Sequence, residues 1–420
     1  MKVAIAQVKP NMSSSEFIAG RETATDTVAE KKLNVLFVDV RDSIGGDSTV
    51  LLSILRYLNQ DRFAPVVACH HKGALYNEIK SIPGLTVIPL NFGTRDSQAA
   101  RMGLTGKLVA AVSFARTFVC ALRLIALIKR RRINVIHSNN TVRAVLITNF
   151  ISRLTGVGYI YHAHSALQDH PVQIKGAREA DCLLANSEYT ATTYAPAGVL
   201  PERFAVIYNG IDTEEFTPEY KSTKLRSELN IDKNAALVGL IGRLTPSKGQ
   251  EELIKAAPAV VAAVPNVRFL LVGDDSIFDN NQGYADRLKA MIHERGLDEK
   301  FIFTGFRRDL RDIYAALNVV LMPSNSPEGL GMVAIEGMAM GRPVITSDAG
   351  ALPEVTKDGA GVSVPAGDYV ALGEALIRVL ADSTIAEKLA VQGRKKVEQH
   401  FSMKQFSPAF ERLLVRVSSK

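Results

Sequence analysis

Short apolar runs rich in valine and isoleucine alternate with longer segments of helical periodicity, and this alternation occurs twice along the chain. Short apolar runs are typical of strands buried on both faces, and helical segments between them are typical of the crossovers of a parallel sheet. The pattern breaks at a polar stretch over residues 210–235, which contains Pro218 and a run of charges. It therefore predicts two doubly wound α/β units of similar size, with a boundary near residues 209–215.

The expected strands can be placed residue by residue. Those of the first unit are Leu33–Val40, Ala64–His70, Thr86–Leu90, Ile133–His137, Gly158–His162, Cys182–Asn186 and Phe204–Tyr208. Those of the second unit are Leu237–Gly242, Arg268–Gly273, Phe301–Thr304, Val319–Met322 and Pro343–Thr346. Ligands of such sheets bind beyond the carboxyl ends of the strands, where helix N-termini point at anions. Functional residues are therefore expected directly after strands, around a cleft between the two units.

The composition is that of a globular protein. Hydrophobic residues make up 47% of the 420 residues and charged residues 22%, which excludes a chain that is mainly disordered, collagen-like or coiled coil. The three cysteines, Cys69, Cys120 and Cys182, show no C-x-x-C spacing. This argues against a disulfide scaffold or a zinc ribbon and favours a reducing compartment.

The net charge of +7 belongs to the first half of the chain. Residues 1–210 hold 24 Lys and Arg against 15 Asp and Glu, and residues 211–420 hold 26 against 28. Such an excess attracts nucleic acid, anionic lipid or a phosphorylated substrate, but no nucleic-acid-binding motif accompanies it. The apolar run Val3–Val8 is too short for a secretory signal, so residues 1–32 are predicted to be an N-terminal extension of a cytoplasmic protein.

A basic amphipathic segment covers residues 101–132. Its apolar part, Leu108–Ile128, is interrupted by Arg116 and Arg123, each of which costs about 3 kcal/mol at a bilayer centre, so a spanning helix is not predicted. Arg116, Arg123 and Arg130 recur every seven residues and share one helical face. Two interpretations remain open: peripheral contact with an anionic inner membrane face, or an ordinary helix packed on the first sheet with a solvated basic side.

Two loops have the composition of phosphate sites. Gly45-Gly46 follows the first expected strand and opens a helix, so the backbone can approach a phosphate or a sugar, although a plain strand-to-helix turn has the same pattern. Arg243 and Lys248 follow the first strand of the second unit and precede a helix that starts near Gln250. Two cations at a helix N-terminus suit a diphosphate, and the alternative is a solvated basic loop.

A pair of carboxylates follows the strand Val319–Met322. Glu328 lies in a loop that begins Pro323-Ser324, and Glu336 is eight residues further on, within a helix expected to run to about Met340. This spacing predicts Glu336 about two turns into the helix, near the same face as Glu328, so that the two carboxylates reach different parts of one ligand. Each glutamate alone has a simpler interpretation, as a partner of the helix dipole or as a surface residue.

These motifs together resemble family 4 of the retaining glycosyltransferases, whose architecture of two Rossmann-like domains is called GT-B. The resemblance rests on the Glu-x7-Glu spacing, the Gly-Arg-Leu and Lys-Gly loop, and Gly350–Val355. It also includes Tyr208–Asp212, Phe303–Phe306 and the ending Phe401-Ser402. It spans nearly all of residues 33–415 and is stronger in the C-terminal half.

The resemblance implies an enzyme that moves a hexose-type unit from a nucleoside-diphosphate sugar, UDP-linked by expectation, to an acceptor hydroxyl, with no cofactor and no metal. The acceptor class stays open between a glycan, a lipid-linked molecule and a small molecule. By the same resemblance, residues 33–209 bind the acceptor and residues 210–400 bind the nucleotide sugar. Residues 401–420 form a helix that packs back toward the N-terminal domain.

The resemblance also assigns the catalytic charges. Arg243 and Lys248 would hold the donor diphosphate, and Gly45 and Gly46 would close over it from the first domain. Glu328 would contact hydroxyls of the transferred sugar. No residue is assigned as a nucleophile, because the released phosphate is expected to take the acceptor proton on the same face.

The remaining implied contacts come from the helix start and from the first domain. The backbone N–H groups of Gly329, Leu330 and Gly331 would contact the sugar and the phosphate, and Glu336 would accept hydrogen bonds from the ribose hydroxyls. His164 matches the catalytic position near the donor sugar and the acceptor. Two alternatives remain: another sugar-nucleotide enzyme, such as an epimerase or an inverting transferase, and a sugar-nucleotide-binding subunit without turnover.

Overall fold

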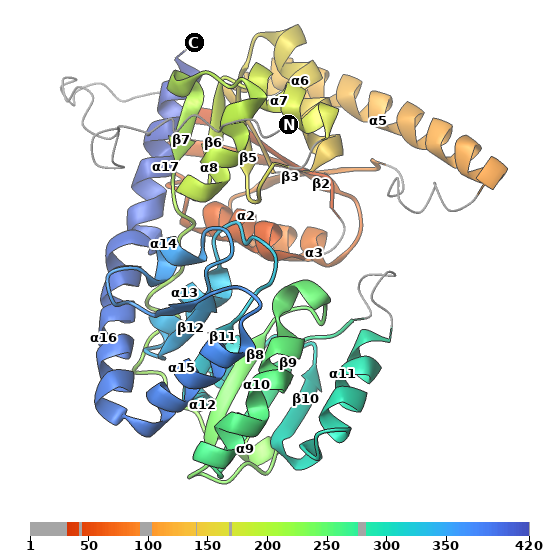
Figure 1. Ribbon diagram of the computed structural model, residues 1–420. Coiled ribbons are helices and arrows are strands. Elements are labelled where there is room, and N and C mark those ends of the chain that lie inside the picture. The colour runs from red at the N-terminus through yellow and green to blue at the C-terminus, as the bar shows by residue number, and fades with distance from the viewer. Residues whose placement is uncertain are drawn as a thin grey trace, which may run out of the picture.

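The chain folds into two α/β domains, one above the other in Figure 1. The structure is a computed structural model that describes residues 32–41, 44–92, 103–139, 141–167, 170–275 and 283–419, with the backbone alone over 103–111. The expected N-terminal extension, apart from Lys32, lies outside the described residues.

The N-terminal domain is built on a parallel sheet of seven strands in the order β3-β2-β1-β4-β5-β6-β7. The strands are β1 (Leu33–Asp39), β2 (Phe63–His70), β3 (Thr86–Leu90), β4 (Val135–Asn139), β5 (Gly158–Ala163), β6 (Cys182–Ala185) and β7 (Phe204–Val206). Its helices are α2 (Gly46–Tyr57), α3 (Ala74–Ser81), α5 (Gly103–Arg131), α6 (Val142–Thr155), α7 (Pro171–Glu179) and α8 (Glu188–Tyr194).

The C-terminal domain repeats this plan with six parallel strands in the order β10-β9-β8-β11-β12-β13. The strands are β8 (Ala236–Ile241), β9 (Val267–Val272), β10 (Phe301–Gly305), β11 (Val319–Met322), β12 (Val344–Ser347) and β13 (Val362–Val364). Its helices are α9 (Lys224–Glu228), α10 (Gln250–Ala263), α11 (Tyr284–His293), α12 (Leu310–Ala316), α13 (Met332–Ala339), α14 (Leu352–Thr356), α15 (Tyr369–Ala381) and α16 (Ser383–His400).

The predicted fold class is confirmed, since both sheets are parallel and carry helices on both faces. Alternate residues of β1 enter different layers: Val35 and Phe37 pack with α2, and Leu36 and Val38 pack with the layer of α5 and α6. The expected strands occur with shifts of at most two residues at an end. The sequence did not predict β13, whose three residues form the edge of the second sheet.

The chain crosses between the domains twice, and the two crossings pair. The Ile211 amide donates to the Phe401 carbonyl at 2.7 Å, and the Met403 amide donates to the Ile211 carbonyl at 2.9 Å. After the second crossing, α17 (Met403–Ser418) runs back along the N-terminal domain, where Phe406 and Phe410 join the core beside α2. Within the described residues, none of the helices combines the length and the apolar character needed to cross a bilayer.

Candidate nucleotide-sugar site

In each sheet, the strand order reverses direction beside the sequence motifs. The chain runs from β8 outward to β9 and β10 and then returns to β11 on the other side of β8, so the loops after β8 and β11 lead in opposite directions. Such a switch point is where open α/β sheets bind ligands. Arg243 follows β8 and Glu328 follows β11, while Gly45 follows β1 at the corresponding switch point of the first sheet.

The loops after β8 and β11 are held together by close backbone packing. Gly249 has a φ of +78°, and a Cβ atom at this position would lie 1.9 Å from the Pro323 carbonyl oxygen. The Asn325 amide donates to the Ser247 carbonyl at 2.8 Å. Between the loops lies a pocket of ≈420 Å³, lined by Arg243, Thr245, Pro246, Ser247, Asn325 and Ser326. The exposed Arg243 and the half-buried Lys248 thus lie on one loop, and Arg243 lines the pocket.

Lys248 and Glu328 are direct partners. The Lys248 ammonium donates to Glu328 Oε1 at 2.6 Å, and the buried Ser324 hydroxyl donates to the same oxygen at 2.6 Å. Both side chains of the ion pair are mostly shielded from water, with 19% and 17% of their surface exposed. These contacts hold the Glu328 carboxylate through one oxygen and place the positive charge of Lys248 next to it.

The helix after Glu328 begins later than the sequence predicted. Gly331, with a φ of +103°, is the N-cap of α13, and the first helical residue is Met332. Glu336 is therefore about one turn into the helix, and the prediction of two turns is wrong because the loop after Glu328 is extended through Gly331. No side chain caps this helix start, so its first N–H groups are available to an anion.

Glu336 lies in a partly buried environment and has one strong partner. The hydroxyl of Tyr314, a fully buried residue of α12, donates to Glu336 Oε2 at 2.6 Å. Burial raises the pKa of Glu336 to about 7, and the hydrogen bond from Tyr314 only partly offsets this. The helix thus carries a carboxylate whose charge is costly in the ligand-free protein, which is typical of functional sites.

The two domains touch at Gly329. A Cβ atom on this residue would lie 2.1 Å from the His164 carbonyl oxygen, so only glycine permits the approach. The Ser187 hydroxyl donates to the Gly329 carbonyl at 2.6 Å, and Thr190 donates to the same oxygen at 3.2 Å. The carboxyl end of β5, which precedes His164, therefore meets the loop after β11, and the predicted site residues His164 and Gly329 are brought together.

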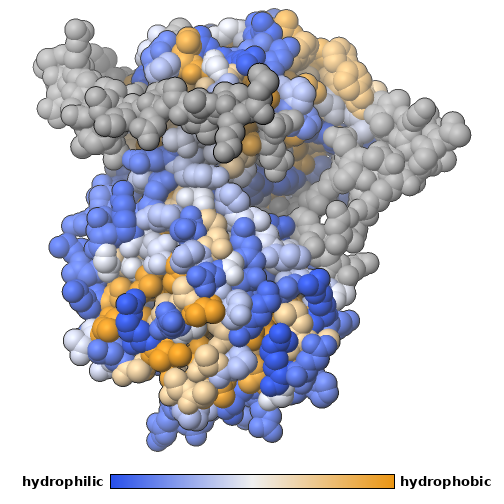
Figure 2. Space-filling view, in the orientation of Figure 1, coloured by the Kyte–Doolittle hydropathy of each residue, from blue (hydrophilic) through white to orange (hydrophobic). Residues whose placement is uncertain are grey.

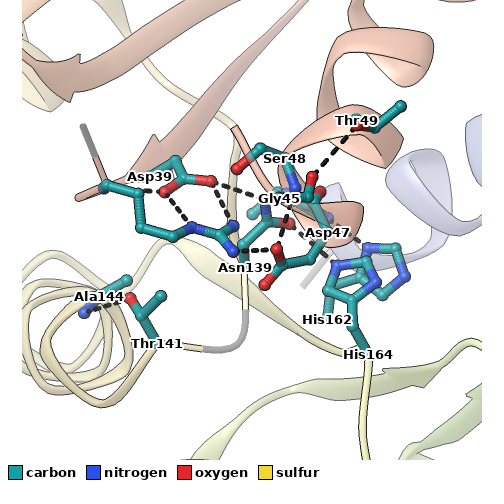
Figure 3. A network of polar contacts seen from close by, with 12 residues as sticks. Asp39, Gly45, Asp47, Ser48, Thr49, Asn139, Thr141, Ala144, His162 and His164 are labelled. Atoms are coloured by element: carbon teal, nitrogen blue, oxygen red, sulfur yellow. Dashed lines mark hydrogen bonds and ion pairs between the residues drawn. The ribbon is translucent and has the colours of Figure 1, made fainter. Parts of the chain in front are cut away.

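His164 belongs to a buried polar network at the carboxyl ends of β1, β4 and β5 (Figure 3). The amide nitrogen of Asn139 donates to Asp39 at 2.9 Å, which leaves its oxygen to face His164 Nε2 at 3.2 Å. Nε2 therefore carries the proton, and Nδ1 has no partner among the described residues. Burial lowers the pKa of His164 to about 4, so the imidazole is neutral at pH 7 and holds a lone pair at Nδ1.

An ion triad joins the end of β1 to the first turn of α2, next to the paired glycines. Arg41 donates to Asp39 at 2.7 Å and forms a second ion pair with Asp47, in the first turn of α2 (Figure 3). Burial by itself would raise the pKa of Asp47, but the Arg41 guanidinium brings it below its ordinary value. Gly45 is the N-cap of α2, and a Cβ atom on Gly46 would meet no atom within 4 Å. There is thus open space at Gly46, beside the ion triad.

Glu354 of α14 provides a further contact between the domains. Its carboxylate accepts from the backbone amides of Glu188 and Tyr189 at 3.0 and 2.7 Å, at the start of α8. The Tyr208 hydroxyl donates to it at 2.9 Å. An acid at a helix start is favourable, so this contact fixes the orientation of the loop Gly350–Val355 against the N-terminal domain.

The structure adds residues that sequence reasoning did not single out. They are Asp39, Arg41, Asp47, Asn139, Tyr314, Ser324 and Glu354. Asp39, Asn139 and Ser324 end or follow strands at switch points, a signal that the sequence already contained. Tyr314 gives no such signal, because its role depends on a helix 22 residues away in the sequence.

The solved structures with this architecture define the class, which is the GT-B fold. The chain superimposes on Anabaena HepE crystallised with UDP with a TM-score of 0.76 and 26% identity, covering 91% of this chain and 100% of that one. Sucrose-phosphate synthase from Thermosynechococcus elongatus, at 21% identity and a TM-score of 0.73, shares the fold over 92% of this chain and 100% of its own.

The sequence comparisons give the family. Residues 221–396 match the model described as glycosyl transferases group 1, and residues 44–215 match glycosyltransferase family 4. The chain belongs to these glycosyltransferases, as the resemblance predicted.

Individual curated relatives match over part of their length. The GDP-mannose-dependent monoacylated alpha-(1-6)-phosphatidylinositol monomannoside mannosyltransferase of Corynebacterium glutamicum is 31% identical over 53% of this chain and 59% of its own. A D-inositol 3-phosphate glycosyltransferase of Mycobacterium sp. (strain KMS) is 34% identical over 43% of this chain and 40% of its own. The chain spans about half the length of these relatives.

Proposed function

We propose that the protein is a retaining glycosyltransferase that transfers a sugar from a nucleoside-diphosphate sugar, UDP-linked in the first instance, to an acceptor hydroxyl. The arrangement at the β8–β11 switch point supports this proposal: Arg243 lines a pocket there, Lys248 on the same loop pairs with Glu328, and α13 begins without a side-chain cap. That HepE was crystallised with UDP and with UDP-glucose supports the choice of donor.

The chemistry needs stabilisation of negative charge on the leaving group. When the bond between the anomeric carbon and the phosphate oxygen breaks, charge develops on the diphosphate. Arg243 and the amides of Gly329, Leu330 and Gly331 would stabilise this charge with little reorganisation. In the ligand-free protein Lys248 rests on Glu328, and both become available to donor groups when the ligand enters. These side chains supply the charge that a divalent metal supplies elsewhere.

The departing phosphate also takes up the proton of the acceptor hydroxyl. As the acceptor oxygen bonds to the anomeric carbon, its proton passes to the departing phosphate oxygen on the same face, so the configuration is retained and no protein nucleophile is needed. Glu328 orients the hydroxyls of the transferred sugar. The neutral His164, with its lone pair at Nδ1, accepts a hydrogen bond from a sugar hydroxyl at the junction of the two domains.

A thermal-shift comparison of UDP, GDP and ADP and of the corresponding nucleoside-diphosphate sugars tests which donor the protein binds. A specific ligand raises the melting temperature by mass action. Turnover with the best donor in the presence of EDTA tests the absence of a metal requirement. Analysis of the product's anomeric configuration separates the retaining transferase from an inverting one and from an epimerase. A protein that binds the nucleotide sugar but releases no nucleoside diphosphate with any acceptor would be a binding subunit instead.

Glu336→Gln is expected to weaken nucleotide binding about tenfold, because the amide keeps one acceptor but loses the charge that attracts two ribose hydroxyls. At the same time it is expected to raise the free energy of unfolding of the ligand-free protein by about 2 kcal/mol at pH 8. With a folded pKa of about 7 against an ordinary 4.5, stability falls as the pH rises from 4.5 to 7 and stays low above 7. The gain should therefore fade toward pH 4.5.

Denaturant unfolding at pH 8 and pH 5 and calorimetric titration with the nucleotide at pH 8 measure these two effects. Glu387→Gln, on the exposed side of α16, is the matched control and should change neither quantity. If the Glu336 variant bound nucleotide with unchanged affinity and gained no stability at pH 8, its assignment to the ribose would be wrong.

A further inference from the structure

The basic charge of the protein is concentrated in one segment. From Ser97 to Gln168 the chain contains no Asp or Glu, whereas it contains ten Lys and Arg. Since the whole chain has a net charge of +7, the residues outside this segment are together net negative. The described part of the segment builds α5, β4, α6 and β5, so the charge lies on one side of the N-terminal domain.

Within this segment, α5 exposes apolar side chains as well as cations. Its buried side, with Leu124 and Ile128, packs on the first sheet. On the outside, Phe114, Phe118 and Leu122 recur every four residues and are 68%, 49% and 50% exposed. A row of exposed arginines runs beside this stripe, at positions 116, 123 and 130. The helix therefore carries an apolar stripe that the domain core does not use.

The neighbouring helix α6 continues this character. It packs against α5 and exposes Leu146, Phe150 and Leu154, again four residues apart. Figure 1 shows α5 extending away from the body of the domain, and apolar surface is in view near its base at the upper right of Figure 2. Clusters of exposed aromatic and aliphatic residues with a surrounding polar rim mark interaction sites rather than ordinary surface.

We propose that the N-terminal domain docks on an anionic lipid bilayer. The docking surface consists of the exposed apolar stripes of α5 and α6 together with Arg116, Arg123 and Arg130. An amphipathic helix with arginines beside an aromatic and aliphatic stripe suits the boundary between headgroups and acyl chains. A second copy of the chain fits poorly, because its identical surface would bring like charges together. The sequence allowed two interpretations of this segment, contact with lipid or a solvated basic side of an ordinary helix. The exposed apolar stripe favours contact with lipid.

The docking surface has a consequence for the acceptor, and this consequence rests on the proposed function. A transferase held at a bilayer meets acceptors that are carried by a lipid, so the acceptor class becomes an amphiphilic molecule with its hydroxyl in the headgroup region. The binding of the protein to the bilayer itself does not depend on the donor or on turnover.

Co-sedimentation with vesicles tests the proposal. The full chain is expected to bind vesicles of phosphatidylcholine with phosphatidylglycerol, to bind vesicles of phosphatidylcholine alone far less, and to lose binding at high salt. Each cation near an anionic surface contributes about fivefold in affinity, so the triple variant of the arginine row should bind about 100-fold more weakly. Two variants probe the surface: Arg116→Gln/Arg123→Gln/Arg130→Gln and Phe114→Ser/Phe118→Ser/Leu122→Ser.

The matched control removes three exposed cations from the C-terminal domain: Arg378→Gln/Lys388→Gln/Lys395→Gln. It should bind the anionic vesicles within about threefold of the unchanged protein. A thermal shift with UDP checks that each variant is folded and reports the donor site separately. If the unchanged protein bound UDP but not the anionic vesicles, or if the control variant lost as much binding as the arginine-row variant, docking would be refuted and the proposed function would stand. Vesicle binding without binding of any nucleotide would refute the proposed function alone.

Discussion

Replacing Lys248 by methionine is expected to lower turnover by about 10² to 10³-fold, the usual cost of removing one preorganised donor from a site of developing charge. Methionine keeps much of the length of the side chain and removes only its charge. The loss should fall mainly on kcat, because the charge on the leaving diphosphate grows in the transition state. Affinity for the nucleoside diphosphate itself should fall less. Steady-state kinetics with the donor identified by thermal shift give both quantities.

The ion pair with Glu328 allows a sharper test of the same prediction. If Lys248 acts only by holding Glu328 in place, then Glu328→Gln and the double variant should be equally slow. If Lys248 also stabilises the diphosphate, the double variant should be slower than either single one. Lys255→Met is the control, because Lys255 also pairs with a glutamate, Glu252, but at 3.5 Å and within its own helix α10. A Lys248→Met enzyme within threefold of the unchanged rate would remove this residue from the mechanism.

The strands could be predicted because a parallel strand between two helical layers is apolar on both faces, and this leaves a continuous run such as Val319–Met322. The same reasoning missed β13, which has only three residues at the edge of its sheet. It also misjudged the start of α13, because the sequence after Glu328 contains two glycines and either can end an extended loop. The point is decided at Gly331, which has a φ of +103° and where a Cβ atom would lie 2.6 Å from the Leu352 side chain of α14.

Only some of the site residues could be predicted, because the others are defined by contacts between distant parts of the chain. Residues that follow strands, such as Arg243 and Glu328, are marked by their position along the chain. Their partners come from elsewhere: the Tyr314 hydroxyl of α12 donates to Glu336 and partly offsets the rise of its pKa, and Asn139 at the end of β4 sets the tautomer of His164. These pairs join elements that are neighbours only in the folded sheets, so no local pattern reports them. They nevertheless determine which atoms carry charge and protons in the site.

Gly249→Ala is expected to lower the free energy of unfolding of the C-terminal domain by about 3 kcal/mol and to abolish measurable nucleotide binding. The left-handed backbone at this residue costs a side chain about 1 kcal/mol. The larger part comes from the Pro323 carbonyl, which lies 1.9 Å from the place of the new Cβ atom, so the loops after β8 and β11 must separate. That separation moves Lys248 away from Glu328 and opens the pocket that Arg243 lines.

Gly367→Ala separates the two contributions to this effect. Gly367 lies in the same domain with a nearly identical φ of +81°, but a Cβ atom there meets nothing within 4 Å. Gly367→Ala should therefore lower the free energy of unfolding by only about 1 kcal/mol, the cost of a side chain on a left-handed backbone, and it should leave nucleotide binding intact. Denaturant unfolding and titration with the nucleoside diphosphate measure both variants. Equal losses of stability in the two alanine variants, with nucleotide binding retained in both, would show that the contact between Gly249 and Pro323 does not hold the phosphate loop in place.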